Sequence, residues 1–217
     1  MSKKICTINN MIGKKANLTE SEIRHIARSF SHYPYPSASF YGFRDRQMIE
    51  RYIELTTKIM KSYCEIFSLD DKAYMMVSDE SSVTPFLQYI RLLWESGKIL
   101  GIRRMYEQLE EGSRIGFSQE VVLRKRKVPF IHIELLAVEE EYWGHKLMSE
   151  LIAFAKSMAR ERKCLLILET DELHKMKKYV HLGFQLKKKR RIKEDVVIYD
   201  LFYDPESEKG SKEDQYE

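Results

Sequence analysis

The segment from residue 130 to residue 170 constrains the fold most, because it reads as strand, helix and strand in direct succession. The run VPFIHIELLAV (128–138) is largely apolar, and a helix with a 3.6-residue apolar stripe is expected at 144–162. The stripe consists of Leu147, Met148, Leu151, Ile152, Ala155, Met158 and Ala159. A second apolar run, CLLILET (164–170), follows the helix. Because parallel strands are covered on both faces, these runs predict a parallel crossover.

Helices and further strands are expected around this unit. A helix begins at LTESEIRHIARSF (18–30), where Thr19 and Glu22 have the spacing of a capping box. Its apolar face comprises Ile23, Ile26, Ala27 and Phe30. Three further helices are expected at 44–67, 83–97 and 99–112, the last two stopped by Gly97 and Gly112. A short helix at 171–184 and strands at 72–78, 184–192 and 195–203 complete the expected elements.

Composition narrows the class of protein. The 217 residues are 43% apolar and 32% charged, which is ordinary for a soluble globular protein. Three scattered cysteines, Cys6, Cys64 and Cys164, do not make a disulfide framework or a zinc site, so we expect a reducing, cytoplasmic setting. No window approaches the roughly 20 apolar residues of a membrane span. The net charge of +4 permits an anionic ligand without requiring nucleic acid.

The turn between the first strand and the helix contains one glycine, Gly144. A tight turn into a helix leaves several backbone N–H groups without intrahelical partners, and they point out of the helix N-terminus. With the positive end of the helix dipole, these donors suit a phosphate group. The segment is therefore either a phosphate-binding strand–turn–helix or a well-packed unit of the same shape.

Two segments carry a family resemblance. LLAVEEEYWGHKLMSELI (135–152) and LILETDELHKMKKYVHLGF (166–184) resemble the GNAT superfamily of acyl-CoA N-acyltransferases, and most closely its puromycin-acetyltransferase-like branch. In the second segment the residues in register are Glu169, Thr170, Tyr179, Gly183 and Phe184. The resemblance implies an α/β GNAT fold, a mixed, splayed sheet with helices on both faces.

The resemblance also implies a division of the chain. Residues 18–203 would form a single GNAT domain, between a flexible segment at 1–17 and a disordered tail at 204–217. Within it, 18–128 would supply the acceptor-side helices and first strands, and 129–203 the coenzyme-binding half. The aromatic segment 33–43 and the helices within 82–111 would contact the acceptor, an amine that the sequence does not identify.

The expected co-substrate of such a protein is acetyl-CoA, with no metal. By the resemblance, the pantetheine arm would pair with Leu136, Ala137 and Val138, and the pyrophosphate would lie on Trp143, Gly144, His145, Lys146, Leu147 and Met148. Lys146 and Met148 stand where the family usually has glycines. Lys146 would either crowd the phosphates or add a charge to them, and glycine is not required there if the backbone is right-handed helical. Lys175 replaces a family asparagine, so one pantetheine contact differs.

The expected reaction is direct attack of an amine of a small molecule on the acetyl group of acetyl-CoA. The resemblance makes Tyr179 the acid that protonates the departing thiolate. For the base there are two candidates, His132 and Glu134, which lie two residues apart and so share one strand face, while Ile131, Ile133 and Leu135 face the other way. The alternative is a half-solvated sheet face with two ordinary polar residues.

Two other function classes remain open. One is a catalytically silent acyl-CoA-binding or protein-interaction module with a GNAT fold, which the missing glycines favour. The other is a nucleic-acid-binding domain that uses the basic runs at 124–127 and 187–193, although neither run is interleaved with stacking aromatics. Nucleic acid is therefore the less favoured partner, and no membrane partner is expected. The sequence does not fix the oligomeric state, and a homodimer is compatible with it.

Overall fold

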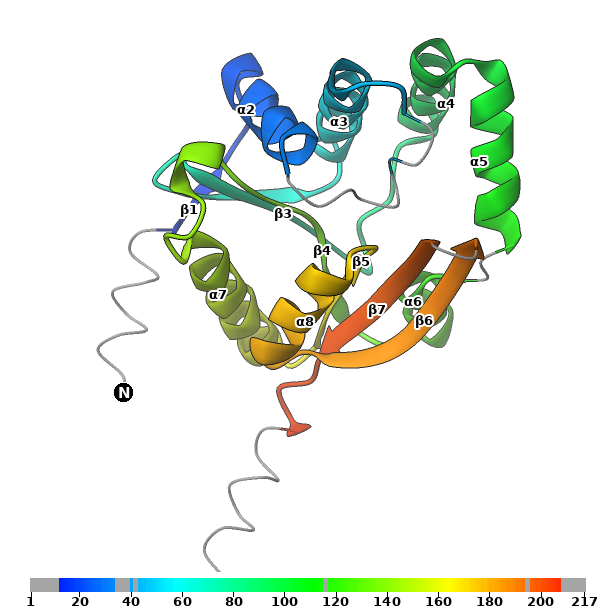
Figure 1. Cartoon of the computed structure of the whole chain (residues 1–217). Coiled ribbons are helices and arrows are strands. Elements are labelled where there is room, and N and C mark those ends of the chain that lie inside the picture. The colour runs from blue at the N-terminus through cyan, green and yellow to red at the C-terminus, as the bar shows by residue number, and fades with distance from the viewer. Residues whose placement is uncertain (1–11, 34–39, 41–42, 115–116, 194–195, 208–217) are drawn as a thin grey trace, which may run out of the picture.

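A computed structural model describes residues 12–33, 40, 43–114, 117–193 and 196–207. One seven-stranded sheet runs through the molecule in the order β1-β2-β3-β4-β5-β7-β6 (Figure 1). All neighbouring strands are antiparallel except β4 and β5, which are parallel as the crossover predicts. The strand bounds are β1 Ile12–Lys15, β2 Glu65–Leu69, β3 Ala73–Asp79, β4 Phe130–Val138, β5 Leu165–Thr170, β6 Gln185–Lys193 and β7 Val196–Tyr203.

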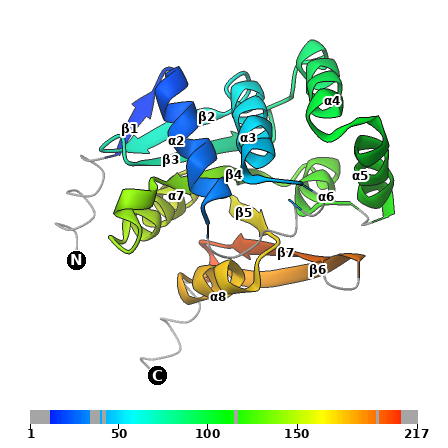
Figure 2. The ribbon, with the colours of Figure 1, turned by 45° about the horizontal axis from the view of Figure 1, so that its top comes forward.

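Helices cover both faces of this sheet (Figure 2). Side chains of α7 and α8 pack on one face, and side chains of α2 and α3 pack on the opposite face. Beyond α3, helix α4 packs on α3 and α5 packs on α4. The helix bounds are α2 Glu20–Ser31, α3 Arg46–Met60, α4 Phe86–Leu100, α5 Ile102–Arg114, α6 Gln119–Arg126, η2 Glu140–Tyr142, α7 Leu147–Arg162 and α8 Leu173–His181. The expected mixed sheet with helices on both faces is confirmed.

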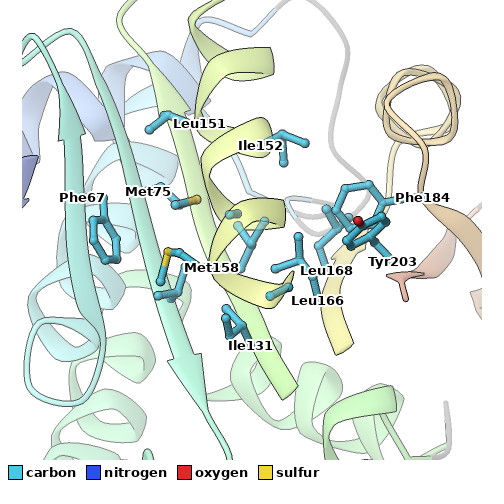
Figure 3. Packing of buried hydrophobic residues seen from close by; sticks show 14 of the residues in the cluster. Phe67, Met75, Ile131, Leu151, Ile152, Met158, Leu166, Leu168, Phe184 and Tyr203 are labelled. Atoms are coloured by element: carbon cyan, nitrogen blue, oxygen red, sulfur yellow. The ribbon is translucent and has the colours of Figure 1, made fainter. Parts of the chain in front are cut away.

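The larger core cluster lies under α7 (Figure 3). The predicted apolar stripe is confirmed, since its buried members are Leu151, Ile152, Ala155, Met158 and Ala159. They pack against Met75 of β3, Ile131 of β4 and Leu166 of β5. The second cluster lies under α2, whose capping box forms as predicted: the Glu22 backbone N–H donates to Thr19 Oγ1, and the Thr19 N–H donates to the Glu22 carboxylate. Burial of these two surfaces fixes the sheet between them.

A β-bulge at Glu134 changes the alternation along β4. Met76 of β3 pairs with Leu135, but its neighbour Val77 pairs with Ile133, so that Glu134 is the extra residue. As a result Ile131 and Ile133 face α7, whereas Leu135 belongs to the cluster under α2. The expectation that Leu135 faces the same way as the two isoleucines is wrong, because a bulge shifts the side-chain period by one residue.

Several predicted boundaries are also wrong. The helix expected at 44–67 ends at Met60, and 65–69 form β2. Helix α4 continues through Gly97 and ends at Leu100, before Gly101 with φ +83°. A side chain at Gly97 would meet Met105 Sδ at 3.3 Å, so this glycine permits the close approach of α5 rather than ending a helix. Helix α5 likewise continues through Gly112 to Arg114.

The described part of the N-terminal segment and the two basic runs lie in or at the end of regular elements. Residues 12–15 form edge strand β1, which corrects part of the flexible segment 1–17, while residues 1–11 and 208–217 lie outside the described residues. The basic run 124–127 ends an unpredicted helix, α6, and the run 187–193 lies in edge strand β6. Lysines on an edge strand discourage pairing with another chain, which gives the second run a structural role. The division of the domain at 128/129 stays a prediction.

Candidate functional site

A pocket of about 760 Å³ lies between the end of β4, the N-terminus of α7 and helix α8. The β4–β5 ladder ends at the pair Ile133–Leu168, and the β4 backbone beyond it, at 136–138, lines the pocket. Every residue predicted to contact coenzyme lines it except His145: the set is Leu136, Ala137, Val138, Trp143, Gly144, Lys146, Leu147, Met148 and Lys175. Residues from three separate elements therefore converge on one cavity.

The turn before α7 is left-handed at two positions. Gly144 has φ +86°, and Lys146, at the N-cap, has φ +65° and ψ +4°. The condition under which glycine would not be required, a right-handed backbone at Lys146, is therefore not met: the lysine adopts a conformation that favours glycine. The turn is tied to β4, because the indole N–H of Trp143 donates to the Val138 carbonyl at 2.8 Å.

The N-terminus of α7 is open toward the pocket. No side chain caps it, and the first intrahelical bond runs from the Glu150 N–H to the Lys146 carbonyl at 3.1 Å. The N–H groups of 147–149 precede that bond and have no partner within the helix. Since all three residues line the pocket, these donors and the positive end of the helix dipole favour an anion there.

Cationic side chains add positive charge around the same cavity. Four lysines line it, Lys146, Lys175, Lys177 and Lys178. Lys175 Nζ lies 4.0 Å from the ring centroid of Tyr33 and 3.9 Å from Glu172 Oε2. Burial lowers the pKa of Lys175, an effect that the Glu172 carboxylate opposes. The position of the family asparagine is thus taken by a cation held between an aromatic ring and a carboxylate.

Tyr179 lies in the wall of the pocket. Its side chain is 8% exposed and packs edge-on against Phe184, with ring centroids 6.0 Å apart. Burial raises its pKa above the ordinary value of 10, with smaller effects from Tyr33 and Glu172. The phenol therefore stays protonated across the neutral range. Tyr179 combines a packing role with access to the cavity.

The two candidate bases lie outside the pocket lining. His132 Nδ1 is 3.3 Å from Glu134 Oε1 and 3.3 Å from Glu120 Oε2, and Ser78 Oγ donates to Glu134 Oε1 at 2.7 Å. Burial disfavours the imidazolium, but the two carboxylates outweigh it and raise the pKa of His132 to about 10. At neutral pH His132 therefore already carries its proton and cannot accept another. The pKa of Glu134 is lowered, because burial, which raises it, is outweighed chiefly by the interaction with His132.

Sequence reasoning missed two carboxylates, one beside the candidate base His132 and one beside Lys175. Glu120 lies in the unpredicted helix α6, and its pKa is lowered to about 2, first by His132 and also by Arg124. Its only sequence signal is the N-cap Ser118, whose Oγ accepts from the Val121 N–H. Glu172, at the N-cap of α8, is buried, and neither of its carboxylate oxygens has a hydrogen-bond partner. No sequence pattern distinguishes such a residue from an ordinary helix cap.

Part of the predicted aromatic lip reaches the pocket. Tyr33 lines it and packs edge-on against Trp143, with ring centroids 5.7 Å apart. Phe43 instead packs between Phe40 and Tyr52 of α3. Tyr35 and Tyr41 lie outside the described residues. Among the described helices, none is long and apolar enough to cross a membrane.

Comparison with known proteins identifies the family. The model of the acetyltransferase (GNAT) family matches residues 49–184, which is more than half of the chain. The chain therefore belongs to the GNAT acetyltransferase family. No curated protein matches it.

Solved structures share the fold. A Corynebacterium glutamicum protein described as histone acetyltransferase HPA2 and related acetyltransferase is 12% identical, with 90% of this chain and 96% of that chain covered and a TM-score of 0.57. Arylalkylamine N-acetyltransferase 2 from Aedes aegypti is 13% identical, with 88% and 97% covered and a TM-score of 0.52. An Agrobacterium tumefaciens acetyltransferase is 23% identical, but only 35% of this chain and 56% of that chain are covered, with a TM-score of 0.32. The likeness to the Corynebacterium glutamicum and Aedes aegypti structures establishes the fold alone.

Proposed function

We propose that this protein transfers an acetyl group from acetyl-CoA to the amine of a small molecule by direct attack. The observation that carries the proposal is the uncapped N-terminus of α7. It lines the same pocket as the end of β4 and four lysines. A pocket of about 760 Å³ lies within the size range of cofactor sites. An amine acceptor agrees with the printed name of the Aedes aegypti relative.

Each part of the pocket suits a part of acetyl-CoA. The N–H groups of 147–149 would hold the pyrophosphate, and the side chain of Lys146 would add a charge to it. The pantetheine arm would pair with β4 at 136–138, where the strand has separated from β5. Lys177 or Lys178 would reach the 3′-phosphate. The thioester would then lie near Tyr179, which lines the same cavity.

The chemistry requires a neutral amine and a proton for the leaving thiolate. We assign the base to Glu134, acting through water because it does not line the pocket, and we exclude His132 because it is already protonated. The amine nitrogen attacks the thioester carbonyl, the carbon–sulfur bond breaks, and Tyr179 protonates the thiolate. Burial makes the phenol of Tyr179 a weaker acid, but it also makes a buried thiolate a stronger base. The pKa values of the proton donor and the proton acceptor therefore shift in the same direction.

The silent acyl-CoA-binding module is the second candidate. The strained Lys146 at the turn and the Lys175 cation in the pocket favour it, since both differ from the family pattern. Calorimetric titration with acetyl-CoA, followed by a thiol-release assay with a panel of amines, separates the two. Binding with amine-dependent thiol release supports the enzyme, and binding without release supports the silent module. If neither occurs, both proposals fail.

Two finer predictions remain. The puromycin-acetyltransferase-like branch is supported by the segments 135–152 and 166–184. A cytoplasmic setting is supported by the cysteine usage.

A further inference from the structure

Glu120, His132 and Glu134 form a compact cluster with metal-ligand chemistry. They come from α6 and β4, and one ligand atom of each lies within 4.8 Å of the others. Across the part of the chain that the structure describes, this is the one group of three or more His, Cys, Asp or Glu residues with that geometry. The bulge brings the cluster together, because it makes Glu134 the extra residue beside His132.

The imidazole of His132 is buried and aimed between the two carboxylates. Its side chain is 9% exposed, and its Nδ1 makes no hydrogen bond. A charge-assisted hydrogen bond would bring nitrogen and oxygen to about 2.7–2.9 Å. Nδ1 instead lies 3.3 Å from Glu120 Oε2 and 3.3 Å from Glu134 Oε1. Zinc bonds of about 2.0–2.2 Å in a tetrahedral shell separate neighbouring ligand atoms by roughly 3.3–3.6 Å. The two distances from Nδ1 fit such a shell, and the two carboxylates lie within 4.8 Å of each other.

Outer contacts hold both carboxylates in place. Arg124 pairs with Glu120 Oε1 at 2.7 Å, which leaves Oε2 directed at His132. Arg124 is itself fixed by bonds to the carbonyls of Asp79, Glu80 and Ser82 at the end of β3. Ser78 Oγ donates to the Glu134 carboxylate. Supporting contacts of this kind orient the ligands in metal sites.

We infer that this cluster binds a divalent transition metal of the zinc class, with Glu120 Oε2, His132 Nδ1 and the Glu134 carboxylate as ligands and a solvent molecule as the fourth. Two carboxylates and a neutral imidazole neutralise a doubly charged cation. Entry of the metal displaces the Nδ1 proton into solvent, so that one proton leaves for each metal bound. The metal would also occupy Glu134 and inhibit acetyl transfer, a consequence that rests on the proposed function.

The test is calorimetric titration of the metal-free 217-residue chain with ZnCl2 in two buffers of different ionisation enthalpy. We expect one site per chain and a buffer-dependent heat that reports a released proton. Glu120→Gln and His132→Asn should each weaken binding at least tenfold. Ser78→Ala keeps all three ligands and should weaken binding about tenfold, so it carries the test if a ligand variant does not fold. Cobalt(II) in place of zinc should give the intense visible absorption of a tetrahedral site.

His32→Asn provides the matched control. His32 also lies beside two carboxylates, with Nδ1 2.7 Å from Glu140 Oε2 and Nε2 4.0 Å from Glu50 Oε1, but at a more exposed position. This variant should bind zinc as the wild type does. Absence of saturable binding by folded wild type, or binding that survives Glu120→Gln, His132→Asn and Ser78→Ala alike, would overturn the inference in favour of an imidazolium ion pair alone. If the protein binds zinc but its metal-free form has no transferase activity, only the proposed function is contradicted.

Discussion

Replacing Lys146 with glycine should stabilise the folded protein. Lys146 has φ +65°, a left-handed conformation that costs about 1–2 kcal/mol for an ordinary L-residue and nothing for glycine. Glycine also has more freedom in the unfolded chain, which offsets about 0.4–1 kcal/mol of that gain. The net expectation is a stabilisation of roughly 0.5–1 kcal/mol. For a chain of this length that raises Tm by about 1–4 °C.

Two variants in the same region isolate the backbone effect. Lys163, the C-cap at the other end of α7, has φ +51° and lies outside the pocket lining, so Lys163→Gly should stabilise by a similar amount. Gly144 has φ +86°, and a Cβ added there would meet nothing within 4 Å. Gly144→Ala should therefore destabilise by about 1 kcal/mol through backbone strain alone. Urea unfolding followed by circular dichroism measures all three.

Coenzyme binding distinguishes the two lysines. Lys146→Gly removes a charge from the pocket and should weaken acetyl-CoA binding by no more than about tenfold, since an exposed ion pair contributes about 0–1 kcal/mol. Lys163→Gly should leave the affinity unchanged.

If Lys146→Gly destabilised the protein while Lys163→Gly stabilised it, a left-handed backbone at Lys146 would be refuted.

Three further predictions concern catalysis, pH and packing. Tyr179→Phe should lower kcat by about 100-fold or more in the thiol-release assay, with the Kd for acetyl-CoA within twofold of wild type, and an unchanged kcat would remove Tyr179 as the acid. Burial opposes ionisation of Glu22, but Lys15 and Thr19 outweigh it, and its pKa lies below the ordinary 4.5. The ionised carboxylate therefore stabilises the fold above pH 4.5, and this contribution is lost as the pH falls. Glu22→Gln should cost about 1–2 kcal/mol of unfolding free energy at pH 7 and progressively less toward pH 3. Urea titrations measure this cost, and a cost that did not depend on pH would contradict the reasoning. Leu151 is fully buried, and Leu151→Ala should lower the unfolding free energy by about 2–5 kcal/mol, whereas a loss below about 1 kcal/mol would contradict the packing under α7.

The sequence predicts best where one periodic pattern decides the structure. The stripe of α7 and the apolar run of β5 required no knowledge of their neighbours, and both are confirmed. The capping box of α2 is equally local, since Thr19 and Glu22 satisfy each other. Local rules also place the turn at Gly144, because a strand must end before a helix can begin.

Other features depend on contacts between distant segments. The bulge at Glu134 is defined by the pairing of β4 with β3, so alternation within β4 alone misplaces Leu135. Gly97 resembles a helix stop, but the approach of Met105 explains it better. Glu120 lies beside His132 in a helix that Arg124 ties to the end of β3, and no local pattern predicts that contact. The left-handed Lys146 is imposed by the turn and not by its own preference.

The most direct test of the proposed function is calorimetric titration of the wild-type protein with acetyl-CoA, with Lys146→Gly measured beside it. The open N-terminus of α7 and the cationic pocket predict one site per chain with micromolar affinity in both proteins. Absence of binding by folded wild type would contradict the account. Binding that appears only in Lys146→Gly would show that the lysine closes the pyrophosphate site.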